Sequence, residues 1–187
     1  GMLLPEGDGS HLPLDAAVAV KEAVLPFARF RTADGHAVDS LLGPEMRSTG
    51  EVMGFDAHYD TAFAKAQAGV GVALPTRGRV FVSVANRDKR AAVAYVRMFR
   101  ELGFEIVSTG GTAQVLRRNG IDSTVVAKIS DRGSEERTVV DLIEAGEIDL
   151  VFNTPSSGGT SRGDGYEIRA AATSVGMPIV TTVAQLG

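Results

Sequence analysis

The sequence predicts an α/β protein built on a five-stranded parallel sheet, and three observations support this prediction. From residue 79 onward, short apolar segments alternate strictly with segments of helical periodicity. The apolar segments are continuous, which is typical of strands buried on both faces. Glycines close most of the helical segments. Alternation of this kind indicates three layers, with helices covering both faces of a parallel sheet.

The elements of this half follow in a regular order. On the first helix, Ala92, Val96 and Phe99 recur on one face, as an amphipathic helix requires. We expect strands at 80–85, 104–109, 123–128, 148–153 and 177–182, and helices at 87–102, at 112–119, around 139–143 and around 168–175.

The first 68 residues have a different character. They contain short elements with interruptions, such as 17–30 with Pro26 inside it, and one expected helix at 60–68. These elements are too few and too short to bury a good core alone. We therefore expect residues 1–68 to be the end of a larger domain, residues 69–78 to be a linker with Gly and Pro breakers, and residues 79–187 to be a second domain.

Composition excludes several classes of protein. The formal charge of −4 argues against a nucleic-acid partner that is bound through bulk positive charge. The chain has no cysteine, so it has neither disulfides nor Cys-ligated zinc. No apolar run approaches the roughly 20 residues of a membrane span, so no membrane partner is expected.

Polar residues gather where the expected strands end. Ligands of such sheets bind outside the carboxyl ends of the strands, where the strand order reverses. Hydroxyls, an amide, two lysines and a glycine-rich turn lie there, and free N–H groups at a helix start favour an anion. The set contains no histidine. The expected phosphate-binding residues are Lys89, Thr109, Gly110, Gly111, Thr112, Lys128, Asn153 and Thr154.

The stretch TGGT at 109–112 by itself leaves two interpretations open. Strand-to-helix turns use Gly and Thr for geometry alone, and Thr is a good N-cap residue. The stretch is neither a GxGxxG nor a Walker motif, so it indicates no dinucleotide or nucleoside triphosphate. We expect Lys89, Lys128 and residues 153–154 to converge on the same edge of the sheet. This convergence favours the second interpretation, in which TGGT helps to bind a single phosphate.

Catalytic and metal sites are not expected. His11, His36 and His58 are widely spaced in the first half, and no histidine follows them to partner Ser156 or Ser157. Acidic residues between 131 and 141 alternate with arginines, which favours solvated ion pairs over metal binding.

Several motifs together resemble the large chain of carbamoyl-phosphate synthase. LLGPEMRSTGEVMG (41–54) is similar to the end of its second ATP-grasp half. The rest resembles its carboxy-terminal regulatory domain, which shares a Rossmann-like fold with methylglyoxal synthase. The further matching motifs are DK (88–89), STGGTAQVLRRNGI (108–121), VVAKI (125–129), VVDLIEAGEIDLVFNTPS (139–156), DGYEIRAAA (164–172) and TT (181–182).

The resemblance implies a regulatory role. The family's large chain is a cytoplasmic ligase that uses ATP, with Mg or Mn, and ammonia from a glutaminase small subunit. Its terminal domain binds an effector such as UMP or IMP without catalysing a reaction. Its phosphate contacts fall on Lys89, Thr109, Thr112, Lys128 and Asn153, with Thr154 beside them. Thr181 matches a position near a second, ornithine pocket, and Pro155 replaces a threonine of one relative.

The resemblance also implies what is absent and leaves two alternatives. The catalytic ATP-grasp core is missing, so the fragment is expected to need no cofactor and to catalyse nothing, while upstream ATP-grasp domains belong to the parent chain. One alternative is a methylglyoxal-synthase-type phosphate lyase, although the loop ISDRGSEERTVV lacks that enzyme's Gly-Gly-Asp motif and Asp131 is the only stand-in for its base. The other is a module that only forms homo-oligomers.

Overall fold

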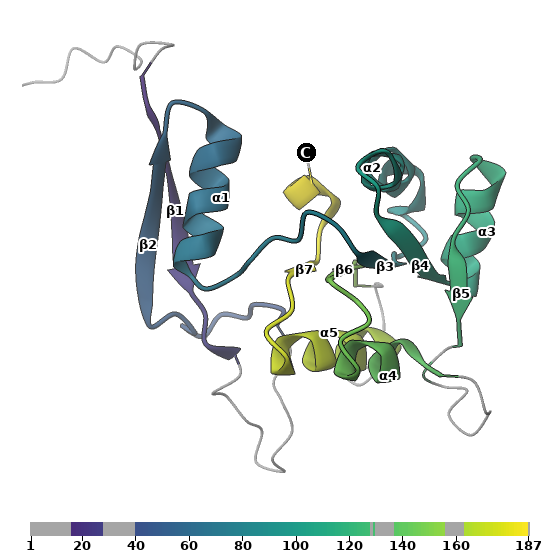
Figure 1. Ribbon diagram of the computed structural model, residues 1–187. Coiled ribbons are helices and arrows are strands. Elements are labelled where there is room, and N and C mark those ends of the chain that lie inside the picture. Colours follow the sequence, from purple (N-terminus) through teal and green to yellow (C-terminus); the bar gives the residue numbers. More distant parts are fainter. Residues whose placement is uncertain (1–15, 28–39, 128, 130–136, 156–162, 187) are drawn as a thin grey trace, which may run out of the picture.

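The computed structural model describes residues 16–27, 40–127, 129, 137–155 and 163–186, and it contains two sheets (Figure 1). The larger sheet has five parallel strands in the order β5-β4-β3-β6-β7. The strands are β3 (Arg79–Ser83), β4 (Glu105–Thr109), β5 (Thr124–Val126), β6 (Leu150–Asn153) and β7 (Ile179–Val180). The predicted five-stranded parallel α/β fold is therefore confirmed.

Helices cover both faces of this sheet (Figure 1). On one face lie α2 (Lys89–Glu101) and α3 (Gly110–Arg118), together with the short 3-10 helix η3 (Val183–Leu186). On the other face lie α4 (Val139–Glu144) and α5 (Asp164–Ser174). The three layers follow from the sequence, because the central strands β3, β4 and β6 carry continuous buried runs and the helices have one apolar side.

Two hydrophobic cores lie on opposite faces of the sheet. Successive strand residues point to opposite faces, so the neighbours Val151 and Phe152 belong to different cores, and both are fully buried. The α2–α3 core contains Phe152 with Val96 and Leu116. The α4–α5 core contains Val151 with Ile143 and other apolar residues. The strand ends are thus held from both sides.

The smaller unit pairs β1 (Val18–Val24) with β2 (Gly50–Asp56) in an antiparallel ladder, and α1 (Tyr59–Gly69) packs on it. The predicted helix at 60–68 is confirmed, whereas the two strands are not predicted from the sequence. Gly54 of β2 explains the close packing. A Cβ at Gly54 would collide with the carbonyl oxygen of Ala62 and lie 2.7 Å from the backbone nitrogen of Ala66.

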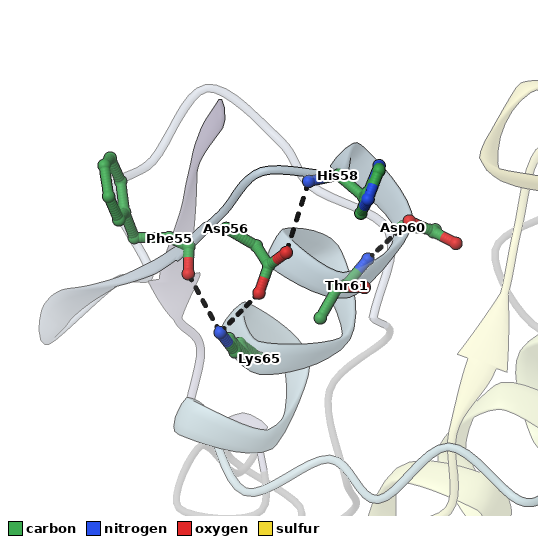
Figure 2. Close-up of polar contacts among 6 residues, drawn as sticks. All are labelled: Phe55, Asp56, His58, Asp60, Thr61 and Lys65. Carbon is green, nitrogen blue, oxygen red and sulfur yellow. Dashed lines mark hydrogen bonds and ion pairs between the residues drawn. The ribbon is translucent and has the colours of Figure 1, made fainter. Parts of the chain in front are cut away.

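A polar cluster connects the end of β2 to α1 (Figure 2). Lys65 Nζ donates to the Phe55 carbonyl oxygen at 3.1 Å and to Asp56 Oδ2 at 2.6 Å. Asp56 Oδ1 accepts from the His58 backbone nitrogen at 3.2 Å. The pKa of the Asp56 carboxyl is lowered from its ordinary value. The hydrogen bond from Lys65 is the largest cause, and the hydrogen bond from the His58 backbone is the second largest.

The lowered pKa of Asp56 predicts a specific response to acid. The folded state binds a proton less readily than the unfolded chain, so this contribution to stability is present above the ordinary pKa of about 3.9 and is lost as pH falls through the lowered value. We expect a carbon-detected NMR titration to place the Asp56 pKa below that value, and Lys65→Met to return it toward normal. An unchanged Asp56 titration in Lys65→Met would contradict this assignment.

Candidate functional site

The strand order reverses at β3, in the centre of the sheet. From β3 the chain moves outward to β4 and β5, and then crosses back to β6 and β7 on the other side of β3 (Figure 1). The carboxyl ends of β3, β4 and β6 therefore lie side by side at one edge. This is the topological switch point, where open parallel sheets bind their ligands.

Lys89 and the first turn of α3 meet at this edge. Lys89 is the first residue of α2, and its Nζ donates to the Gly111 carbonyl oxygen at 3.0 Å. A Cβ at Gly111 would lie 3.3 Å from that Nζ, whereas a Cβ at Gly110 would meet nothing within 4 Å. The two glycines thus leave room for the ammonium group and open space at the helix start.

The two threonines of this turn interact with each other. Thr109 has the extended backbone of an N-cap residue, but its side chain makes no capping hydrogen bond. Its hydroxyl donates instead to Thr112 Oγ1 at 3.3 Å, and Thr112 is only 3% exposed. The interpretation of Thr109 as a capping side chain is therefore wrong. The first N–H groups of α3 keep their ability to bind an anion.

Asn153 and Thr154 are buried and connect β6 to the end of β3. Asn153 Nδ2 donates to the Ser83 carbonyl oxygen at 3.0 Å. Thr154 Oγ1 accepts from the Ala85 backbone nitrogen at 2.9 Å, which leaves its hydroxyl hydrogen able to donate elsewhere. These side chains hold the two strand ends together at the position where the sequence predicts a ligand.

Arg169 of α5 is a residue of this site that the sequence reading missed. Its side chain is 5% exposed, and its Nη1 donates to Asn153 Oδ1 at 2.9 Å. A signal was present in the sequence, because Arg169 interrupts an apolar helical run between Ile168 and Ala171, both of which are buried. An arginine within a buried stripe requires polar partners.

Arg87 connects the loops that follow β3 and β6. Its Nη2 donates to the Pro155 carbonyl oxygen at 2.8 Å, and its Nε lies 3.6 Å from Asp88 Oδ2. The backbone oxygen of Pro155 is therefore used here, although this residue lacks the hydroxyl of a threonine. Arg87 adds a further cation beside Lys89.

Some residues from the sequence prediction fall elsewhere. Lys128, Asp131, Ser156 and Ser157 lie outside the described residues. Thr181 directly follows β7, so it lies at the same edge of the sheet. The strand β6 separates β7 from β3, so Thr181 lies to one side of the switch point.

Surface hollows mark this region only in part. One lies between the outer faces of α2 and α3 and includes Asn86, Lys89, Arg90 and Arg97. Another lies at the opposite, amino edge of the sheet, beside Phe104. The site is therefore recognised by its convergent polar groups and not by its depth.

The chemistry available at the switch point is anion binding. Three cationic side chains, a helix start, three hydroxyls and an amide converge there. Among the described residues, no group of three or more His, Cys, Asp or Glu side chains could hold a metal ion. In the same residues, no helix is both long and apolar enough to cross a membrane.

Comparison with protein families identifies a match within the larger unit. Residues 91–181 match the family model described as an MGS-like domain. This span includes most of α2, the helices α3, α4 and α5, and the strands from β4 to β7.

Comparison with curated proteins gives matches along the whole chain. It is 70% identical over 187 residues to the carbamoyl phosphate synthase large chain of Kocuria rhizophila, covering 100% of this chain and 17% of that protein. It is 69% identical over 186 residues to the same protein of Pseudarthrobacter chlorophenolicus, covering 98% and 17%. The chain thus spans about 17% of the length of these relatives.

Among solved structures, the chain is similar to the crystal structure of methylglyoxal synthase from Elizabethkingia anophelis NUHP1. The TM-score is 0.45 with 16% sequence identity, and the match covers 59% of this chain and 75% of that chain.

Proposed function

This chain belongs to the carbamoyl phosphate synthase large chains as a segment that contains an MGS-like domain, and from this premise we propose that it is an allosteric effector-binding module. Its ligand is a nucleotide monophosphate, UMP or IMP. In the whole protein, binding regulates ATP-dependent carbamoyl phosphate synthesis for pyrimidine and arginine production. The whole protein is then a cytoplasmic ligase with ATP and Mg or Mn at upstream ATP-grasp domains, ammonia from a glutaminase small subunit, and contacts between copies.

One observation carries the proposal: cationic and hydrogen-bonding groups from β3, β4 and β6 converge at the switch point. Lys89 lies against the first turn of α3, and Asn153 lies at the end of the neighbouring strand β6. A phosphate needs several donors around its oxygens, and these groups provide them from separate elements.

Each group has a role in the proposed site. Lys89 supplies mobile charge, and the N–H groups at 110–112 donate to phosphate oxygens together with the Thr112 hydroxyl. The Thr109 hydroxyl has a single hydrogen, so it joins them by turning away from Thr112 when the ligand binds. Asn153 and Thr154 donate from the end of β6, and Lys128, which follows the third predicted strand in the sequence, supplies a further positive charge. Thr181 contributes to a second effector pocket.

The domain division is part of the same proposal. Residues 1–68 are the end of an ATP-grasp domain, residues 69–78 are a linker, and residues 79–187 are the effector-binding domain. An effector that binds more tightly to one arrangement of these domains shifts the whole protein toward it. The differential affinity sets the size of the regulation, which is typically about 1–3 kcal/mol.

Substitutions in the first turn of α3 and at the start of α2 test the binding site. We expect Lys89→Ala and Thr109→Ala each to weaken UMP or IMP binding about 10-fold or more, because each removes a hydrogen bond to a charged group, worth about 1.5–3 kcal/mol. Isothermal titration calorimetry measures the affinity, and circular dichroism verifies the fold.

A matched control is Lys21→Ala, because Lys21 is a 66% exposed lysine on β1 that pairs with Glu51 in the other unit. Its UMP affinity should equal that of the unsubstituted chain. If Lys89→Ala and Thr109→Ala also bind normally, the site is misplaced. If UMP, IMP and ornithine all fail to bind the unsubstituted chain, the proposed function is wrong.

A further inference from the structure

We propose that Arg169 is a positioning residue of the anion-binding site. Its buried guanidinium fixes the orientation of the Asn153 amide and thereby presents an N–H of that amide to the ligand. The inference rests on the proposed function, and it adds a residue to the site that neither the sequence pattern nor the family motifs assign.

The hydrogen bond between Arg169 and Asn153 has a fixed direction. An arginine side chain only donates, so the Asn153 atom that faces Arg169 Nη1 at 2.9 Å must be the amide oxygen. The amide nitrogen then points to the opposite side, where it donates to the Ser83 carbonyl oxygen at 3.0 Å. A flipped amide would place its NH₂ group against a guanidinium and its oxygen against a carbonyl, so both contacts would be repulsive.

The Asn153 amide keeps one N–H donor for a ligand. An asparagine NH₂ group has two hydrogens, and within the described part of the chain Asn153 Nδ2 uses one of them for Ser83. The other hydrogen is available to an anion at the strand ends. Without Arg169, the amide could rotate and present its oxygen, which would repel a phosphate.

The charge of Arg169 strengthens the Asn153 amide as a hydrogen-bond donor. The guanidinium of Arg169 is permanently charged, and its residue is only 5% exposed. Hydrogen bonds in series polarise one another inside a protein, so a cation on Oδ1 makes the N–H groups of the same amide better donors.

Gly165 provides the space for the contact between Arg169 and Asn153. Gly165, in the first turn of α5, would place a Cβ 3.0 Å from Arg169 Nη1 and 3.4 Å from Asn153 Oδ1. A side chain at residue 165 would therefore crowd the guanidinium and contact the amide oxygen. The glycine allows α5 to approach β6 closely enough for the arginine to reach the asparagine.

The test uses Arg169→Met, which keeps much of the side-chain volume and removes the donors. We expect the dissociation constant for UMP and for inorganic phosphate to rise about 10-fold, the size of a lost hydrogen bond to a charged group. Arg169→Lys should restore part of the affinity, because lysine donates but does not match the planar geometry. Arg117→Met, on the exposed last turn of α3, is the control and should bind normally.

A double-mutant cycle separates positioning from a general structural effect. If Arg169 acts through Asn153, Arg169→Met combined with Asn153→Ala weakens binding no more than Asn153→Ala alone. Full additivity of the two effects overturns the proposal. Normal binding by a folded Arg169→Met overturns it as well.

Two further measurements cover an Arg169→Met variant that does not fold and an unsubstituted chain that binds no anion. If Arg169→Met does not fold, Gly165→Ala perturbs the same hydrogen bond without removing a charge, and unaltered phosphate affinity in that variant overturns the proposal. If the unsubstituted chain binds no anion, the proposed function fails, and NMR decides the positioning separately. The side-chain amide resonances of Asn153 should then shift in Arg169→Lys without ligand, and unchanged resonances overturn the positioning role.

Discussion

Replacing Phe152 with alanine is expected to lower the free energy of unfolding of the five-stranded unit by about 3–5 kcal/mol. Phe152 lies in the central part of the sheet on β6, and it is 0% exposed. Its ring fills the core between the sheet and the α2–α3 layer. Truncation removes apolar contacts and leaves a cavity that strands fixed on both sides cannot close.

Urea unfolding followed by circular dichroism measures this loss, with Phe152→Leu expected to cost less because leucine refills part of the volume. The matched control is Phe55→Ala on β2, where the side chain is 59% exposed. That variant should change stability by no more than about 0.5 kcal/mol. A Phe152→Ala protein as stable as the Phe55→Ala control would show that the core is described wrongly.

The same substitution also affects the binding site. Asn153 and Thr154 directly follow Phe152, so a loosened β6 moves two of the proposed ligand contacts. A ligand that binds only the folded state stabilises it by mass action. UMP at saturating concentration should therefore raise the urea midpoint for unfolding of Phe152→Ala. Such a rise would show that the variant still binds the proposed ligand in its folded state.

The sequence predicted the larger unit well because its signals are local. Continuous apolar strands and amphipathic helices bury their own residues in order, so each element could be recognised without knowledge of its neighbours. The meeting of Lys89 with residues 109–112 could also be predicted, because the carboxyl ends of parallel strands share an edge.

The features that escaped prediction depend on distant partners. The strands β1 and β2 pair across an intervening stretch, and neither has the regular alternation with helices seen later. Arg169 was not expected in the site because its partner, Asn153, lies 16 residues earlier on another element. The Thr109 hydroxyl could cap a helix or reach Thr112, and only the local geometry decides between them.

Gly54→Val is expected to dismantle the β1–β2–α1 unit while the five-stranded unit stays folded. The added Cβ would collide with the Ala62 carbonyl oxygen and lie 2.7 Å from the Ala66 nitrogen. Both are backbone atoms of α1, so they cannot move aside as a flexible side chain would. Overpacking of this kind costs about 3 kcal/mol or more. A two-stranded sheet depends on packing against a helix for its stability, and this substitution disrupts that packing.

Amide NMR spectra measure the result residue by residue, and Gly50→Ala is the matched control. Gly50 begins the same strand, but a Cβ there meets nothing within 4 Å. We expect Gly54→Val to lose the dispersed signals of residues 18–69 and to keep those of β3 to β7, with UMP affinity within about 2-fold of normal, because distant sites are nearly additive. Loss of all signals together would mean that the two units fold as one, and the proposed division at residues 69–78 would be wrong.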